Sequence, residues 1–412
     1  MHMFRSHTSI VRFVLLLSCE LGISHSLPSQ TPPTMITSVA WSSDGQYLAS
    51  GSNNGLVVCW DVSSGKTKWQ WQGSAHGIYK LYFDTRRQAF LVLEKYGDAV
   101  FLNSATGDAS LRLNLDFPER DKQYVAVLSV AGFDDTSETL SLAGNLLPAV
   151  HILDLTKVSG APKQQSLHIG KLIDWLHPPS IKDSDKSSFM IHTIRPDASS
   201  ANMGDFSVSA MDDDHLVDLS TCKDGLRTLG VTEAGWLVSW DLTGKENPSY
   251  RRQVVTQGQG SNYLLDVQCG TNNLAVTTGT TGKYGTIQLW DATEGVMTDH
   301  TDTGSTSLIE LGVAFSSDGK LLVSNGDLAY IFWKTDTNRL IRLGRMYHEG
   351  SLSPSNEIQM NLAFLPGTHL LGAGEGTAVL IVDIDKGKLK CLSNDCGGMS
   401  FRFDNSGDQI SH

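Results

Sequence analysis

A tryptophan-aspartate pair occurs three times in this chain, and each time it ends a short apolar run. The pairs are Trp60-Asp61, Trp240-Asp241 and Trp290-Asp291. The stretches 36–62 and 216–242 have the same length and the same order of apolar runs and polar turns, and in both an Asp-Gly turn lies sixteen positions before the tryptophan. A fixed period of this kind predicts a repeat fold, because each repeat must bury its apolar face against a neighbour.

The first repeat predicts four antiparallel strands that are joined by tight turns. Residues 36–41 alternate apolar and polar side chains, as a half-buried strand does. Further strands are expected at 47–50, 56–61 and 67–71, with turns at Asp44-Gly45, Asn54-Gly55 and Ser64-Gly65. Four such strands form one blade of a propeller.

The tryptophan of the third strand serves as an anchor for finding the other repeats. Equivalent positions are Leu102, Leu153, Trp240, Trp290, Trp333 and Val382, at intervals of 42, 51, 87, 50, 43 and 49 residues. All but one interval lie near the period of about 40–45 residues per blade. We therefore predict an all-β propeller of four-stranded antiparallel blades over residues 35–393, with seven blades, or eight as the alternative. The double interval contains an insertion or a degenerate blade near 171–205, and its polar segment 178–188 is expected to be a surface loop.

The two ends of the chain each allow more than one interpretation. Residues 1–34 form a leader, in which 1–26 are similar to a secretory signal peptide. The alternative is that residues 9–19 form a strand that closes the ring. Residues 394–412 repeat the opening of a blade, so they begin a further, truncated blade or take part in ring closure. No apolar run reaches the length of about 18 residues that a membrane span needs.

Two segments carry a resemblance to a known family. The segment SSDGQYLASGSNNGLVVCWD from Ser42 and the segment SSDGKLLVSNG from Ser316 resemble WD40 repeats. The resemblance implies a β-propeller that serves as a rigid platform for protein partners, without catalysis of its own. It also implies a network of His, Ser, Trp and Asp in each blade, but Asn54 and Gly230 stand where Asp and Ser are expected. We therefore expect apolar packing, rather than this network, to hold the blades together.

A second resemblance concerns the segment from Asp61 to Trp69. It is similar to the tryptophan-docking pattern of quinoprotein-like propellers, in which a tryptophan locks neighbouring blades. Thr106-Gly107 and Gly387 repeat the turn of this pattern, but Leu111 and Cys391 stand where the docking tryptophan belongs. These enzymes also use a vicinal cysteine pair near the cofactor, which this chain lacks. The resemblance keeps a propeller enzyme or a small-ligand binder at the central channel as an alternative function.

Charge and cysteine content limit the other function classes. The formal net charge is -12, which disfavours nucleic acid as a partner because phosphate binding needs clustered Lys and Arg. The cysteines at 19, 59, 222, 269, 391 and 396 match no zinc pattern. Cys59 and Cys269 lie in apolar runs and are interpreted as small buried hydrophobes. Cys391 and Cys396 are expected to remain unpaired, with a disulfide between them as the alternative.

No catalytic, cofactor-binding or metal-binding residue is predicted. The run Asp212 to Asp214 is interpreted as a solvated turn rather than a cation site. The histidines at 151, 168, 177 and 192 lack the spacing of metal ligands. The run Gly279 to Gly285 is similar to a phosphate loop, but a strand follows it instead of a helix, so a hairpin turn is expected.

The function predicted from the sequence is a protein–protein interaction scaffold or adaptor that uses propeller faces and loops and binds no cofactor. The first alternative is the enzyme or ligand binder named above. The second is the detached sensor part of a larger regulatory protein. Carboxylates or histidines that converge on the central channel would favour the enzyme. A cytoplasmic or nuclear location is expected, with secretion as the alternative if residues 1–26 are a signal peptide.

Overall fold

The computed structural model describes a set of segments that all lie in one compact unit, Thr34–His412. The described residues are 34–95, 98–116, 128–136, 138–144, 150–157, 164–168, 191–194, 216–222, 227–232, 235–241, 250–253, 267–270, 274–281, 284–302, 312–326, 329–335, 338–348, 361–393 and 399–402. The candidate loop 178–188 and the candidate strand 9–19 lie outside them.

The first repeat folds into the four antiparallel strands that the sequence predicts. The strands pair in the order β1-β2-β3-β4. Their bounds are β1 Ile36–Trp41, β2 Tyr47–Ser52, β3 Leu56–Asp61 and β4 Lys66–Gln72. Gly45 closes the first turn with φ 70°, a conformation that glycine adopts without steric cost. Ser42 and Asp44 fix the same turn, because the Ser42 hydroxyl donates to the Asp44 carboxylate and accepts from the Tyr47 N–H.

Five further sheets also contain four strands that follow one another in the chain. Their strands are β5 Ile78–Asp84, β6 Ala89–Glu94, β7 Asp98–Asn103 and β8 Ala109–Asp116; β14 Leu216–Thr221, β15 Arg227–Thr232, β16 Trp236–Asp241 and β17 Tyr250–Gln253; β18 Val267–Cys269, β19 Leu274–Thr281, β20 Tyr284–Asp291 and β21 Val296–Asp302; β22 Val313–Phe315, β23 Leu321–Gly326, β24 Ala329–Lys334 and β25 Ile341–His348; β26 Asn361–Phe364, β27 Leu370–Glu375, β28 Ala378–Asp383 and β29 Lys388–Cys391. The prediction of four-stranded antiparallel blades is therefore confirmed. Strands β19 and β20 pair up to Thr281 and Tyr284, so the run from Gly279 to Gly285 is part of a hairpin, as predicted.

A further sheet departs from this regular form. It contains β9 Leu128–Asp134, β10 Thr139–Gly144, β11 Val150–Asp154 and β13 Ile191–Ile194. A short 3-10 helix, η1 Leu155–Lys157, follows β11. Strand β13 comes from inside the double interval and pairs antiparallel with β11. Strand β13 therefore completes an existing sheet. In the described residues, the insertion near 171–205 builds no sheet of its own.

Two sheets carry a fifth strand on their outer edge. Strand β12 Gln164–His168 pairs in parallel with β8. Strand β30 Met399–Arg402 pairs antiparallel with β25, in the sheet that begins with β22. Residues 399–402 thus extend an existing sheet rather than opening a new blade, because the exposed edge of β25 offers unpaired backbone groups.

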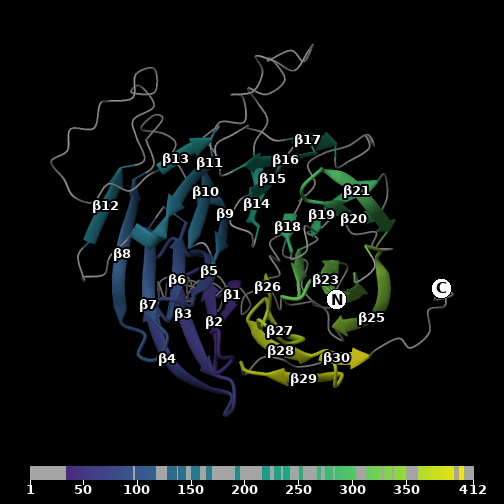
Figure 1. Cartoon of the computed structure of the whole chain (residues 1–412). Helices are drawn as coiled ribbons and strands as arrows, with labels where there is room; N and C mark the ends of the chain where they lie inside the picture. Colours follow the sequence, from purple (N-terminus) through teal and green to yellow (C-terminus); the bar gives the residue numbers. More distant parts are fainter. Residues whose placement is uncertain are drawn as a thin grey trace, which may run out of the picture. The chain divides into compact units, whose positions relative to one another are not determined.

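The first strands of the sheets lie innermost and contact one another in a closed cyclic order, which Figure 1 shows. The order is β1, β5, β9, β14, β18, β22, β26 and back to β1. Side chains join neighbouring inner strands: the Leu81 N–H donates to Ser38 Oγ, the Cys269 N–H donates to Ser220 Oγ, and Thr37 Oγ1 donates to the carbonyl of Ile78. These bonds fix the inner strands relative to one another.

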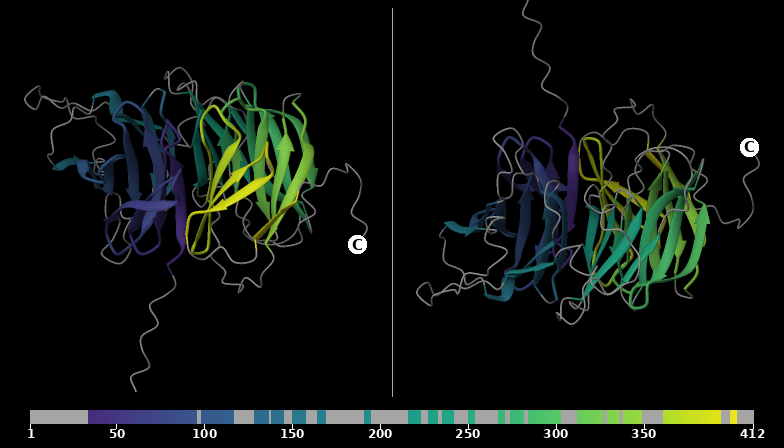
Figure 2. Two further views of the ribbon diagram at one scale, coloured as in Figure 1. Left: turned by 90° about the horizontal axis from the view of Figure 1, so that it is seen from below. Right: turned by 90° about the horizontal axis from the view of Figure 1, so that it is seen from above.

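The first and last sheets meet at one seam of this ring. In both views of Figure 2 the yellow strands of the last sheet lie beside the purple strands of the first. The Ile36 N–H donates to the carbonyl of Gly376, and Trp41 Nε1 donates to the carbonyl of Ala363. All four strands of each sheet come from its own repeat, so no described strand is shared across the seam.

The apolar core lies between neighbouring sheets. Separate clusters of buried side chains fill the spaces between adjacent sheets, and the cluster across the seam contains Ile36, Val39, Trp41, Leu365 and Ile381. The predicted anchors all lie in third strands. Six of them are buried, namely Leu102, Leu153, Trp240, Trp290, Trp333 and Val382. Trp60 is only half-buried. Where β10 faces β14 and β15, the contact is polar, because Ser141 Oγ lies 2.9 Å from Thr221 Oγ1 and 3.0 Å from Thr228 Oγ1.

The cysteine interpretation needs two corrections. Cys222 and Cys269 form a disulfide with Cα atoms 4.9 Å apart, so Cys269 is not simply a small buried hydrophobe. The bond joins the end of β14 to the end of β18, which are inner strands of neighbouring sheets. Cys391 is also disulfide-bonded, against the expectation that it stays unpaired. Cys59 alone fits its prediction: it is a free, buried thiol, and burial raises its pKa to about 12.

The docking prediction is also confirmed in part and corrected in part. Trp69 packs on the turn of the next sheet, where Trp69 Nε1 donates to the carbonyl of Ser104. Gly107 allows this contact, since a Cβ there would lie 2.7 Å from the Trp69 ring. In the last sheet the docking residue is Lys390, not Cys391, and its Nζ donates to the carbonyls of Val62 and Ser63. The docking residue lies one position earlier in the last sheet because the β3–β4 pair contains a β-bulge, which adds one residue, whereas β28 and β29 pair without a bulge.

Candidate functional site

An aromatic side chain ends most of the inner strands at one equivalent position. Strand pairing aligns Trp41 with Leu48 and Trp60, and the same three-residue row recurs in the other sheets. The innermost members of these rows include Trp41, Phe83, Phe133, Phe315 and Phe364, which we call the aromatic collar. In the two remaining sheets Thr221 and Cys269 take this position. Four members of the collar are half-buried and so remain accessible.

The collar surrounds a cavity at the centre of the ring. Its volume is about 320 Å³, and its lining comes from β1, β5, β9, β18, β22 and β26 together with the turns that follow them. All five collar residues contribute to the lining. The volume is at the lower end of the range of about 300–1,000 Å³ that is usual for ligand sites.

A second cavity of about 340 Å³ adjoins the first. It shares with it Lys80, Tyr82, Phe133, Asp135, Gln268 and Pro366, and it reaches toward β14 through Ser220 and Thr221. The Cys269 end of the disulfide also contributes to its lining. The two cavities together extend from the collar toward β9 and β14.

Few charged groups line these cavities. Lys80 lines both of them, and so does Asp135. Asp135 accepts a hydrogen bond from the Thr85 N–H at 2.7 Å. Loss of water around this carboxylate raises its pKa, against the lowering effect of its hydrogen bonds to Thr85. Asp134 lines only the second cavity and accepts from the Thr136 N–H.

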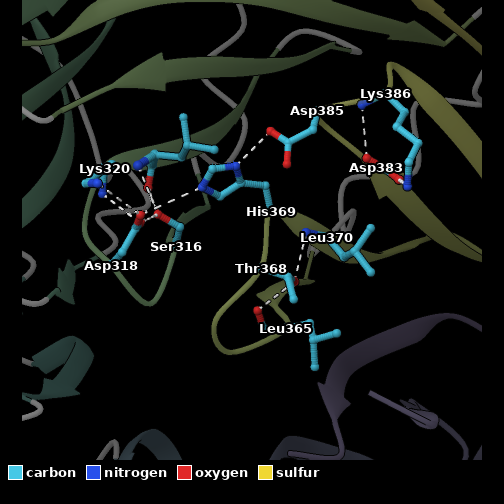
Figure 3. Close-up of polar contacts among 11 residues, drawn as sticks. Ser316, Asp318, Lys320, Leu365, Thr368, His369, Leu370, Asp383, Asp385 and Lys386 are labelled. Carbon is cyan, nitrogen blue, oxygen red and sulfur yellow. Dashed lines mark hydrogen bonds and ion pairs between the residues drawn. The ribbon is translucent and has the colours of Figure 1, made fainter. Parts of the chain in front are cut away.

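A histidine bridges two neighbouring sheets in the turns that follow their inner strands (Figure 3). His369 Nδ1 lies 2.8 Å from Asp385 Oδ1, and His369 Nε2 lies 3.8 Å from Asp318 Oδ2. Asp318 is fixed by Ser316, whose hydroxyl donates to it. The hydrogen bond to Asp385 and the charges of both carboxylates raise the pKa of His369. Lys320 Nζ lies 4.0 Å from Asp318 on the other side.

The other candidates from the sequence do not meet at a site. Residues 212–214 and His177 lie outside the described residues, and His151, His168 and His192 fall in three separate strands, β11, β12 and β13. Among the described residues, no group of three His, Cys, Asp or Glu side chains is arranged to hold a metal ion. The structure's described part likewise contains no helix long and apolar enough to cross a membrane.

Comparisons with known proteins agree on the fold. The chain is similar to the structure of U3-55K (12% identity, 83% of this chain and 89% of that chain covered, TM-score 0.56) and to the RRP9 WD40 repeats (12%, 83% and 88%, 0.56). It is also similar to the Cps50 (Swd1) β-propeller domain of Myceliophteria thermophila (12%, 88% and 99%, 0.53). A family model described as WD domain, G-beta repeat matches residues 21–61. The solved structures show that the fold is a β-propeller, and one segment of the chain matches the WD40 repeat.

The propeller contains one element of the network that the resemblance to WD40 repeats implies. The indole N–H of the anchor tryptophan donates to a hydroxyl of the second strand in three sheets: Trp60 to Ser50, Trp290 to Thr277, and Trp333 to Ser324. In the β14–β17 sheet Gly230 replaces the hydroxyl, as the sequence indicated, and Trp240 Nε1 is buried without a hydrogen-bond partner. Apolar packing and these single bonds therefore both contribute to holding the blades.

Sequence reasoning missed the aromatic collar and Lys80. The sequence nevertheless contains a signal for the collar, because an aromatic residue is the last or next-to-last residue of five inner strands. The repeats are easiest to align on the third strand, whereas the collar lies at the end of the first strand. Only the strand pairing places the collar residues of different repeats around one cavity.

Proposed function

We propose that this WD40 propeller is a scaffold of seven blades that binds protein partners at the central cavity, and that it has no catalytic activity of its own. The observation that carries the proposal is the aromatic collar around a cavity of about 320 Å³. Half-buried aromatic side chains are enriched where proteins bind one another, because they offer a large contact area at a low cost in conformational entropy. The closed cyclic order of seven inner strands supports the blade count.

The lining of the cavity supports a binding role over an enzymatic one. The first cavity has Asp135 as its carboxylate among the described lining residues, and no described histidine lines either cavity. An enzyme of this fold would need several titratable groups that converge on the channel. One similar structure is that of the Mitotic Checkpoint Complex (13% identity, 83% of this chain and 86% of that chain covered, TM-score 0.54).

The proposal is tested by affinity purification with a variant of the cavity. Leu362 lines the cavity, and Leu362→Arg places a charge among the collar residues. Ile341→Arg is the matched control, since Ile341 is 48% exposed on the outer strand β25. We expect partners bound by the wild-type chain to be lost with Leu362→Arg and kept with Ile341→Arg, while circular dichroism shows both variants folded. Equal recovery from both variants would place the binding surface elsewhere.

We further propose that the chain matures in an oxidising compartment, with residues 1–26 as a secretory signal peptide. Two observations support this alternative over a cytoplasmic or nuclear location: the Cys222–Cys269 disulfide and the disulfide-bonded Cys391. Disulfides persist in secreted proteins and are rare in the cytosol. Alkylation of free thiols in intact cells, followed by mass spectrometry, tests the proposal: Cys222 and Cys269 should resist the reagent until a reductant is added. The domain limits 1–34, 35–393 and 394–412 remain proposals.

A further inference from the structure

Lys80 differs from the residues that occupy its position in other sheets. Lys80 occupies in β5 the position that Ser38 occupies in β1 and Asp218 in β14. Each lies three residues before the position at which the collar residues stand. Ser38 and Asp218 both accept a hydrogen bond from the neighbouring inner strand, from the N–H groups of Leu81 and Val267. The side chain of Lys80 makes no hydrogen bond or ion pair with any described residue. At a position that joins blades elsewhere, its ammonium group is left without a partner.

The surroundings of Lys80 leave this ammonium group available to a ligand. Lys80 is half-buried, and it lines both central cavities. The acids that line the same cavities are Asp134 and Asp135, and both accept from backbone N–H groups of turns. The Tyr82 hydroxyl donates to the carbonyl of Ala131 and is also occupied. A half-buried ammonium group without an ion-pair partner loses part of its hydration and gains most from an incoming anion.

We propose that Lys80 binds a carboxylate of the partner, so that the segment entering the cavity carries an Asp or Glu side chain beside an apolar one. This inference rests on the proposed function, because it names the chemistry that the same cavity recognises. A cavity of about 320 Å³ admits a few side chains of an extended peptide rather than a folded domain. The collar contacts the apolar side chain and excludes water, which strengthens the ion pair at Lys80. Asp135, on the same lining, disfavours a segment with more than one carboxylate.

The test uses a phage-displayed library of random linear peptides and the whole chain. The library is selected on the wild-type protein, and the retained peptides are sequenced and synthesised. A second version of each peptide replaces its Asp or Glu with Asn or Gln. Binding of both versions is measured by fluorescence anisotropy to the wild-type chain, to Lys80→Met, to Lys80→Arg and to Asp135→Asn. Lys66→Met is the matched control, since Lys66 is an exposed lysine of the outer strand β4.

We expect retained peptides to be rich in Asp or Glu next to apolar residues. Their dissociation constants should rise roughly tenfold or more with Lys80→Met, as the loss of a hydrogen bond to a charged group implies, and should change little with Lys80→Arg or Lys66→Met. The amide version should bind Lys80→Met and wild type equally well. Asp135→Asn should tighten binding of the acidic version. Peptides whose binding is lost with Leu362→Arg but unchanged with Lys80→Met would overturn this inference alone. Failure to retain any peptide at the cavity would overturn the proposed function with it.

Discussion

A single residue of the second strand determines whether the indole N–H of the anchor tryptophan has a hydrogen-bond acceptor. Three anchor tryptophans donate to a hydroxyl one strand away, and Trp240 does not. Trp240 is fully buried, as predicted from the sequence, so its unpaired indole N–H has lost its water without gaining a partner. Gly230 is the cause, because it stands where Ser50, Thr277 and Ser324 stand in the other sheets.

Replacing this glycine should therefore stabilise the protein. We expect Gly230→Ser to raise the free energy of unfolding by about 1 kcal/mol, the usual net value of one buried hydrogen bond. Urea denaturation followed by tryptophan fluorescence measures the change. In the Trp240→Phe background the same substitution should give no such gain, since the donor is absent. An equal gain in both backgrounds would show that the serine acts through strand propensity and not through the indole.

At the scale of elements, the fourth strands of four sheets contact the backbone near the turn of the next sheet, each with a different side chain. Trp69 donates to Ser104, Arg252 to Gly295, and Lys390 to Val62 and Ser63. Asp299 instead accepts from the Leu340 N–H. A bond to the backbone of the turn requires only a polar or aromatic group of suitable reach. Trp69, Asp299 and Lys390 occupy equivalent positions in the strand pairing, whereas Arg252 lies two residues further along β17, where Tyr250 has the equivalent position.

The contact of Trp69 with Gly107 can be tested with two glycines that share a backbone conformation. Gly107 has φ 79° and Gly367 has φ 74°, but a Cβ on Gly367 would meet nothing within 4 Å. Gly367→Ala should cost about 1–2 kcal/mol for the left-handed conformation alone. Gly107→Ala should cost about 1–3 kcal/mol more, from overlap with the indole. Thermal denaturation of both variants gives the difference, which should disappear in the Trp69→Ala background; a difference that persists there would assign it to another contact.

The His369 bridge should make stability depend on pH. The pKa of His369 is raised by its hydrogen bond to Asp385 and by both carboxylates. The bridge therefore stabilises the fold fully below the unfolded value of about 6.5 and loses this contribution as pH rises through the higher folded pKa. His369→Gln should lower stability at pH 5.5 or so by up to about 1 kcal/mol, and less at pH 9 or so, because the site is partly exposed. His300→Gln, an exposed histidine of β21, is the control, and a pH-independent loss for His369→Gln would contradict the bridge.

At the scale of the whole molecule, a covalent bond joins two neighbouring sheets. The Cys222–Cys269 disulfide links positions 47 residues apart in the sequence. Closing a loop of this length restricts the unfolded chain, and removal of such a bond costs typically about 2–4 kcal/mol. The Cys222→Ala/Cys269→Ala double variant should show this loss in denaturant titrations. A reductant should lower the wild-type stability toward that of the double variant, and an unchanged wild type would contradict a stabilising role.

The sequence predicted the elements better than their meeting points. The four strands of the first repeat and all seven third-strand anchors lie where the period places them, because local alternation and turn residues determine both. Cys222 and Cys269 belong to different repeats, and spacing alone does not indicate which cysteines become neighbours. The long interval before β13 gave no indication that this strand pairs with β11. Lys390 was missed because one bulge, present in the β3–β4 pair and absent from β28–β29, shifts the count by one.

The seam between β1 and the last sheet has a mechanical consequence. The two sheets that meet there hold together through Ile36, Trp41 and Lys390 and through side-chain packing, without a described strand that crosses from one sheet to the other. Tension applied between β1 and β29 would break these few contacts in succession, rather than shear a whole ladder of backbone bonds at once. Under a pulling force the ring should therefore open first at this seam, with the Cys222–Cys269 bond holding the opposite side closed.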